Sequence, residues 1–225
     1  MKPLSPGAGS ICLAAVAGFV DTLGFVGLFG LFTAHVTGNF VLIGAELVQP
    51  GRGVALKLLA FPAFVLAVAM SRGLVLSLSA SKTSVQRMLL GSQGLLLLCF
   101  MLAGLRSAAP GPHSETWTYA AGLLGAAAMG LQNGCNRMLF AKLTPNTVMT
   151  GNVTQLVIDV TDWLVGRRDA ALRSRISSLF FPVLAFALGS MGGAIGYVRL
   201  GFAALLFPSL LIALLAVATV QSDLS

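Results

Sequence analysis

The sequence predicts an all-α integral membrane protein, and three observations support that fold class. Of the 225 residues, 56% are hydrophobic and 9% are charged, and the mean hydropathy is +0.90. Soluble domains give about a quarter of their residues to charge, so lipid must be the main solvent of this chain. Apolar stretches of about 20 residues, long enough to cross a bilayer as a helix, recur along it. The polar tripeptide Thr-Gly-Asn occurs once in each half, at residues 37–39 and 150–152.

Six apolar stretches are expected to span the bilayer. They cover residues 11–32, 57–79, 89–105, 117–139, 178–197 and 201–220. Two shorter apolar segments, 40–47 and 148–164, follow polar breaks, and the first is too short to cross as a helix. The Pro-, Gly- and Ser-rich stretch 106–116 separates the halves, so we expect a first membrane repeat at 1–110 and a second at 111–225.

An internal repeat relates the two halves. Four features occur in the same order in each: Gly18–Asp21 and Gly130–Asn133, Thr37–Asn39 and Thr150–Asn152, Glu46 and Asp159, and Phe61-Pro62 and Phe181-Pro182. The second and third pairs share an offset of 113 residues, and the first pair needs a gap of one residue. This order indicates a duplication.

The distribution of basic residues favours an inverted arrangement of the repeats. If the short segments do not cross, each half has three spans, and nine basic residues lie inside against four outside. If they do cross, there are eight crossings, the halves run parallel, and the counts are eight against five. Because basic residues stay on the cytoplasmic side, we expect six spans and two short, broken or re-entrant helices, with eight crossings as the alternative. Inverted repeats with interrupted helices are a recurring plan of secondary transporters.

Several other classes of protein are not expected. The net charge is +7 and the pI about 10.0, but the basic residues form short clusters between apolar stretches, so nucleic-acid binding is not predicted. Cys12, Cys99 and Cys135 lie inside apolar stretches and are interpreted as small buried hydrophobic residues. We expect no metal, no cofactor and no catalytic set, because His35 and His113 are the only histidines.

The motifs also carry a family resemblance. Residues 18–21, Gly-Phe-Val-Asp, followed by residues 32–39, Phe-Thr-Ala-His-Val-Thr-Gly-Asn, resemble the signature of the YoaK-like family of bacterial inner-membrane proteins, which are grouped as a domain of unknown function. The resemblance covers essentially the whole chain. It implies a multi-pass protein of the bacterial inner membrane, but no substrate, reaction or site.

Asp21 and His35 are the candidates for ion coupling. An aspartate near the middle of a span is unfavourable by about 2.5–3.5 kcal/mol, so it needs a partner, a water-filled cavity or protonation. Its repeat counterpart is the neutral Asn133, and the offset of 113 pairs His35 with Val148, so neither ionisable group is duplicated. A coupled site is expected, and the alternatives are an interhelical hydrogen bond for Asp21 and a packing role for His35.

The two Thr-Gly-Asn motifs are the candidate substrate site. If each motif opens a short helix, its free N–H groups form a partly positive end inside the membrane. Two facing ends would hold a polar or anionic solute, whereas the simpler alternative is that the threonines only cap the helices. The predicted substrate-binding residues are Thr37, Gly38, Asn39, Thr150, Gly151, Asn152, Asn133, Gln132 and Gln155. Glu46 and Asp159 are expected to be solvated near the membrane surface, and Gly189–Gly196 to give close helix contact or dimerisation.

These features predict a small secondary transporter or permease rather than an enzyme. Its site would lie between the two repeats and would take a small polar or anionic solute, coupled to a proton or another cation. The alternative is an ion or small-solute channel, and a membrane-embedded enzyme or lipid-handling protein is less favoured. The expected partners are the bilayer and the solute, and the thin six-span scaffold suggests a homodimer.

Overall fold

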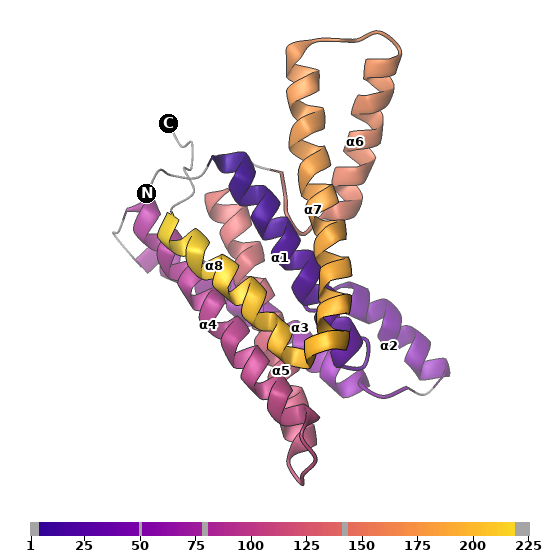
Figure 1. Ribbon diagram of the computed structural model, residues 1–225, viewed down its shortest axis with the longest axis vertical. Helices are drawn as coiled ribbons and strands as arrows, with labels where there is room; N and C mark the ends of the chain where they lie inside the picture. Colours follow the sequence, from indigo (N-terminus) through magenta and orange to yellow (C-terminus); the bar gives the residue numbers. More distant parts are fainter. Residues whose placement is uncertain (1–4, 50, 78–80, 141–143, 219–225) are drawn as a thin grey trace.

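The computed structural model describes residues 5–49, 51–77, 81–140 and 144–218, and these residues are almost entirely helical (Figure 1). In chain order the helices are α1 (Pro6–Gly27), α2 (Gly38–Val48), α3 (Val54–Ser77), α4 (Lys82–Ala108), α5 (Ser114–Leu139), α6 (Met149–Leu164), α7 (Ala170–Leu200), the 3-10 helix η1 (Gly201–Leu205) and α8 (Leu206–Ala218). The all-α fold class is confirmed. The predicted span ends at Ser79 and Val220 lie outside the described residues.

Four stretches of the described chain are long and apolar enough to cross a membrane. They are Gly7–Gly27, Val54–Ser77, Thr83–Ala108 and Ala170–Ala218, the last of which contains α7, η1 and α8. The predicted span 117–139 corresponds to α5, which is long enough at 26 residues but is not among these four. Because α5 is flanked by α3 and α4 and is largely buried, its surface need not be uniformly apolar.

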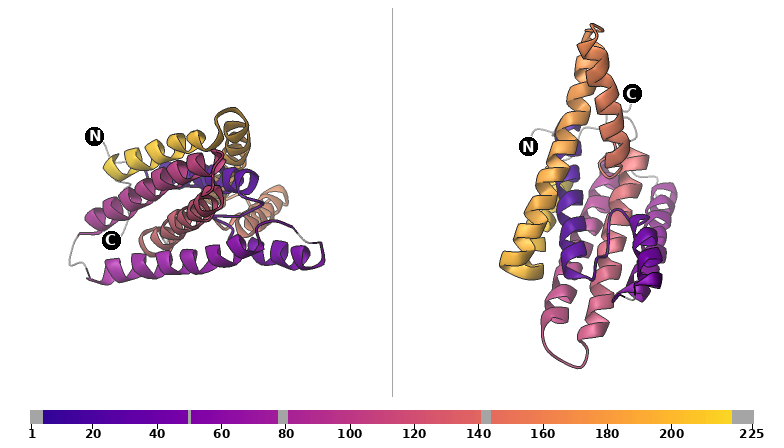
Figure 2. Two further views of the ribbon diagram at one scale, coloured as in Figure 1. Left: turned by 90° about the horizontal axis from the view of Figure 1, so that it is seen from below. Right: turned by 90° about the vertical axis from the view of Figure 1, so that its right-hand side faces the viewer.

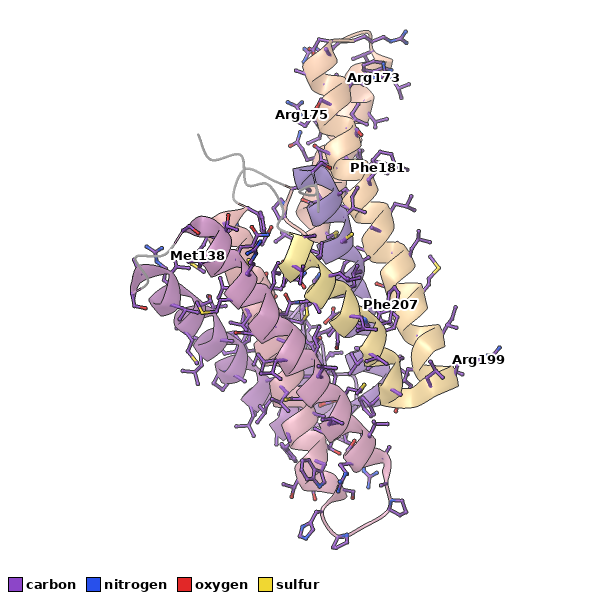
Figure 3. The ribbon with its side chains drawn as sticks, turned by 60° about the vertical axis from the view of Figure 1, so that its left-hand side comes forward. Met138, Arg173, Arg175, Phe181, Arg199 and Phe207 are labelled. Atoms are coloured by element: carbon purple, nitrogen blue, oxygen red, sulfur yellow. The ribbon has the colours of Figure 1, made fainter. Side chains whose placement is uncertain are left out.

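Helix α7 is longer than a bilayer core requires. Its 31 residues correspond to about 46 Å of helix, against a hydrocarbon core of about 30 Å. Arg173 and Arg175 lie near one end of α7 and Arg199 at the other, with Phe181 between them (Figure 3). At the end that carries Arg173, the α6–α7 hairpin extends beyond the other helices (Figures 1 and 2).

The first helix of each half packs against the third helix of the other half. Helix α1 lies along α7, and α5 lies along α3. Glycines permit both approaches: a Cβ on Gly18 or Gly189 would collide with a backbone carbonyl across the α1–α7 interface, and a Cβ on Gly130 would lie 2.7 Å from the Phe64 carbonyl oxygen. The predicted close contact at the small residues of α7 is therefore made within the chain, against α1.

The short helices α2 and α6 each pack against the long helix that follows them, α3 and α7 respectively. Helix α2 starts at Gly38, but the Thr37 side chain makes no capping hydrogen bond. Helix α6 starts at Met149, so Thr150 lies inside its first turn rather than at its cap. Neither threonine therefore caps its helix through its side chain: Thr37 is at the N-cap position but makes no capping hydrogen bond, and Thr150 lies inside α6.

Candidate functional site

Asp21 holds together the loop between α1 and α2. Its side chain is buried, and Oδ1 accepts hydrogen bonds from the backbone N–H of Thr33 and of Ala34, both at 2.7 Å. Oδ2 lies 2.7 Å from Nδ1 of His35. The hydrogen bonds from these donors offset the cost of removing the carboxylate from water. The partner that an aspartate inside a membrane needs is thus supplied by the chain's own loop.

His35 connects this loop to α7. Its ring packs edge-on against Phe186, with 5.4 Å between ring centroids, and about a third of its side chain is exposed. His35 lies in the loop, outside the membrane-spanning helices. The pair is an ionisable unit that joins α1, the loop and α7.

The second half contains a neutral version of this arrangement. Oδ1 of Asn133 accepts a hydrogen bond of 2.6 Å from Thr147 Oγ1, and both pairs are separated by 14 residues in the sequence. Thr147, and not Val148, therefore takes the position that corresponds to His35. The one-residue gap in the repeat lies after Thr147, which the offset of the Thr-Gly-Asn motifs alone does not reveal.

The asparagines of the two motifs bind the backbone seven residues earlier. Asn39 donates to the Phe32 carbonyl oxygen at 2.8 Å and accepts from the Phe32 N–H at 2.9 Å. Asn152 donates to the Pro145 carbonyl oxygen at 2.6 Å. It accepts no hydrogen bond from Pro145, because proline has no backbone N–H. Both side chains are buried. The asparagines fix the loops that lead into α2 and α6.

The other residues of the motifs lie at the surface of the chain. Thr37, Thr150 and Gly151 are exposed, and Gly38 is half-buried against Phe32. Helices α2 and α6 do not contact each other. The structure therefore does not bring the two Thr-Gly-Asn segments into one site.

A chain of buried amide side chains runs between α4, α5 and the loop before α6. Gln93 Nε2 donates to Gln132 Oε1 at 2.7 Å, and Gln132 Nε2 donates to the Leu13 carbonyl oxygen at 2.8 Å and to Asn146 Oδ1 at 3.1 Å. Asn146 Nδ2 reaches Asn136 Oδ1 at 3.3 Å. Of these four amides the sequence singled out only Gln132. A glutamine inside the apolar stretch 89–105 was the available signal for Gln93.

Two ion pairs tie the short helices to the long ones that follow. Lys57 Nζ, which is almost fully buried, lies 2.8 Å from Glu46 Oε1 and 2.6 Å from the Phe29 carbonyl oxygen. Arg175 binds Asp159 through two hydrogen bonds of 2.7 Å. The expectation that Glu46 and Asp159 are solvated is wrong, since each faces a cation on the next helix.

The Asp159 pair also involves Gln155. The carboxylate of Asp159 is fully buried, and the Arg175 hydrogen bonds lower its pKa, opposed by burial and assisted by a hydrogen bond from Gln155. Gln155 is thus a partner of Asp159 at 2.7 Å and does not join the amides around Gln132.

Two polar pockets lie beyond the predicted site residues. The first, of about 480 Å³, is lined by the ends of α3, α4 and α5 and by Phe29, and it includes Arg52, Ser107, Glu115 and Thr118. The second, of about 360 Å³, lies between the start of α1, Thr144 and the first half of α7, and three serines of α7 line it. Helix α1 begins beside the second pocket and ends shortly before Phe29, which lines the first. Within the described residues, no three His, Cys, Asp or Glu side chains cluster as metal ligands.

The fold and these groups define a multi-pass, all-helical membrane protein whose largely apolar core contains hydrogen-bonded polar side chains. The chain belongs to the family described as "Protein of unknown function (DUF1275)", whose model matches residues 9–218. The match confirms the resemblance to an uncharacterised family. No curated protein and no solved structure matches the chain.

Proposed function

We propose that this protein is a small secondary transporter of the bacterial inner membrane that moves a small polar solute, coupled to a proton. The observation that carries the proposal is that non-helical backbone interrupts the helices twice, before α2 and before α6, between the two polar pockets. Side chains of the preceding long helix hold residues of each loop: the buried Asp21 binds Thr33 and Ala34, and the partly buried Asn133 binds Thr147. Non-helical backbone at membrane depth is typical of the sites at which transporters bind their solutes.

An inverted repeat accounts for the paired contacts. The repeat aligns Gly18 with Gly130 and Asn39 with Asn152, and both members of each pair make corresponding contacts, with the helix of the other half and with the preceding loop respectively. The exchange of partners, α1 with α7 and α5 with α3, is the pattern that a two-fold axis between the halves produces, and in an inverted repeat that axis lies in the membrane plane. Such an axis would make the two pockets equivalent on opposite sides of the bilayer.

The dimensions fit a route across the membrane. The residues from Gly7, beside the second pocket, to Gly27, close to the first, make about 30 Å of helix, which matches the hydrocarbon core. The Asp21–His35 pair and the amide chain lie along this length. Alternating access would open one pocket at a time while the loops shift between two positions.

Coupling to a proton is assigned to Asp21 and His35. Only the first half has ionisable groups at this position, since Asn133 and Thr147 replace them in the second. A proton taken up by this pair would change the charges across its 2.7 Å contact and so the strength of its hold on the loop, because hydrogen bonds to a charged group are stronger than those to a neutral one. A proton would thereby shift the balance between the two loop positions.

Uptake into proteoliposomes tests this function. Purified protein is reconstituted, a pH gradient is imposed, and uptake of pooled radiolabelled amino acids, sugars and small organic acids is measured. We expect accumulation that collapses with a protonophore and is lost in Asp21→Asn, but persists in Asp162→Asn, whose carboxylate forms only a long ion pair of 3.6 Å. Flux down a gradient well above about 10³ per second would identify a channel instead. No solute uptake by a folded protein would refute the proposal.

A further inference from the structure

The first pocket is lined by one charged side chain that only donates hydrogen bonds and one that only accepts them. Arg52 lies just before α3, and its guanidinium carries five N–H donors and no acceptor. Glu115 lies in the first turn of α5, and its carboxylate only accepts. Both charged side chains line the pocket, yet neither forms an ion pair with another residue in the described part of the chain.

Two hydroxyl groups that line the same pocket add further acceptors. Ser107 donates its hydroxyl hydrogen to the Gly104 carbonyl oxygen at 2.8 Å, and Thr118 donates to the Ser114 carbonyl oxygen at 2.9 Å. A hydroxyl has one hydrogen, so these two oxygens have only lone pairs left for a ligand. The start of α3, which follows Arg52 in the chain, adds the positive end of its helix dipole to the charge of Arg52.

We propose that this pocket binds a small zwitterion that carries a carboxylate and an ammonium group. The carboxylate would pair with Arg52, and the ammonium would donate to Glu115 and to the oxygens of Ser107 and Thr118. The volume of about 480 Å³ lies within the range of small-molecule sites. A ligand with one charge would leave either Arg52 or Glu115 without a charged partner. The inference deepens the proposed function by naming the class of solute, and it rests on that function only for transport, not for binding.

Binding to the purified protein in detergent tests the inference. The probes are L-alanine, β-alanine and γ-aminobutyrate, which differ in the distance between their charges, with propionate and propylamine as singly charged controls. Calorimetry should give a zwitterion at least about tenfold tighter binding than either control. Arg52→Gln and Glu115→Gln should each weaken that binding about tenfold or more. Arg106→Gln, an exposed arginine at the same end of α4 that does not line the pocket, should leave it unchanged.

A charge exchange provides the sharper control. Arg52→Glu alone should lose zwitterion binding, and the double variant Arg52→Glu with Glu115→Arg should regain it, because a zwitterion can bind in the reversed orientation. Both positions are exposed, so these variants should elute as the wild type does. The inference is overturned if every zwitterion binds more weakly than a Kd of about 10 mM, or if Arg52→Gln and Arg106→Gln behave alike. Zwitterion binding without flux would refute the transporter instead, and flux of another solute without zwitterion binding would refute only this inference.

Discussion

Replacing Asp21 separates its role as a hydrogen-bond acceptor from its role as a charge. Asp21→Asn keeps an oxygen at the position of Oδ1, which can still accept from the N–H groups of Thr33 and Ala34. It also presents an N–H toward His35, whose Nδ1 can accept when the ring is neutral. Asp21→Leu keeps the number and branching of the side-chain heavy atoms but removes every acceptor.

The expected magnitudes follow from the hydrogen bonds that each variant loses. Thr33 is fully buried and Ala34 nearly so, so in Asp21→Leu both N–H groups lose their partner inside the protein. Each buried unsatisfied group costs about 1–3 kcal/mol, which gives a loss of about 2–6 kcal/mol. Asp21→Asn exchanges charged for neutral hydrogen bonds, and we expect a loss of about 1 kcal/mol.

Equilibrium unfolding in mixed micelles measures these differences. The protein is titrated with a denaturing detergent and followed by far-ultraviolet circular dichroism, and the free energies of unfolding of the three proteins are compared. Cysteine labelling at position 36, introduced by Val36→Cys, should report faster loop opening in Asp21→Leu than in Asp21→Asn. Val36 is buried in the folded loop, which makes its accessibility a direct readout.

The ranking of the two variants decides the question. If Asp21→Leu is as stable as Asp21→Asn, the carboxylate does not hold the loop, and the assignment of its hydrogen bonds is wrong. The matched control is Asp162, whose side chain is a third exposed and whose ion pair measures 3.6 Å. Its Asn and Leu variants should differ by no more than about 0.5 kcal/mol.

Three further changes test other contacts by the same unfolding assay. Asn39→Ala removes two hydrogen bonds to one peptide group and should cost about 2 kcal/mol, and no measurable loss would contradict the loop-fixing role. Gly189→Ala should destabilise the protein by about 1–3 kcal/mol through overpacking against α1. Gly91 has open space around it, so Gly91→Ala should cause no such loss, and equal effects of the two changes would refute the close contact. Arg175→Gln should destabilise the protein at neutral pH, because it removes both hydrogen bonds to the Asp159 carboxylate. Because Arg175 lowers the pKa of Asp159, this difference is present above the ordinary carboxyl pKa and should vanish as the pH falls through the lowered value; a difference that persists in strong acid would refute it.

The sequence by itself determined the class of protein and the position of most helices. Hydropathy is summed over neighbouring residues, so the apolar stretches revealed α1, α3, α4, α5 and α7 without knowledge of their packing. The repeated Thr-Gly-Asn motif also pointed to the two loops that precede α2 and α6. It did so because a buried asparagine that binds the backbone seven residues earlier leaves a local trace in the sequence.

The tertiary structure decided which polar groups meet. Gln132 binds Gln93, which is 39 residues away in the sequence, and the Leu13 carbonyl oxygen, which is 119 residues away. Those contacts depend on how the helices are rotated about their axes. Separate helices also converge to pair Arg175 with Asp159 and to bury that carboxylate fully. The pocket that Arg52 and Glu115 line forms in the same way. In an apolar chain almost any helix face can contact lipid, so the sequence leaves the rotation of each helix open. The need to satisfy buried hydrogen-bonding groups then selects one arrangement.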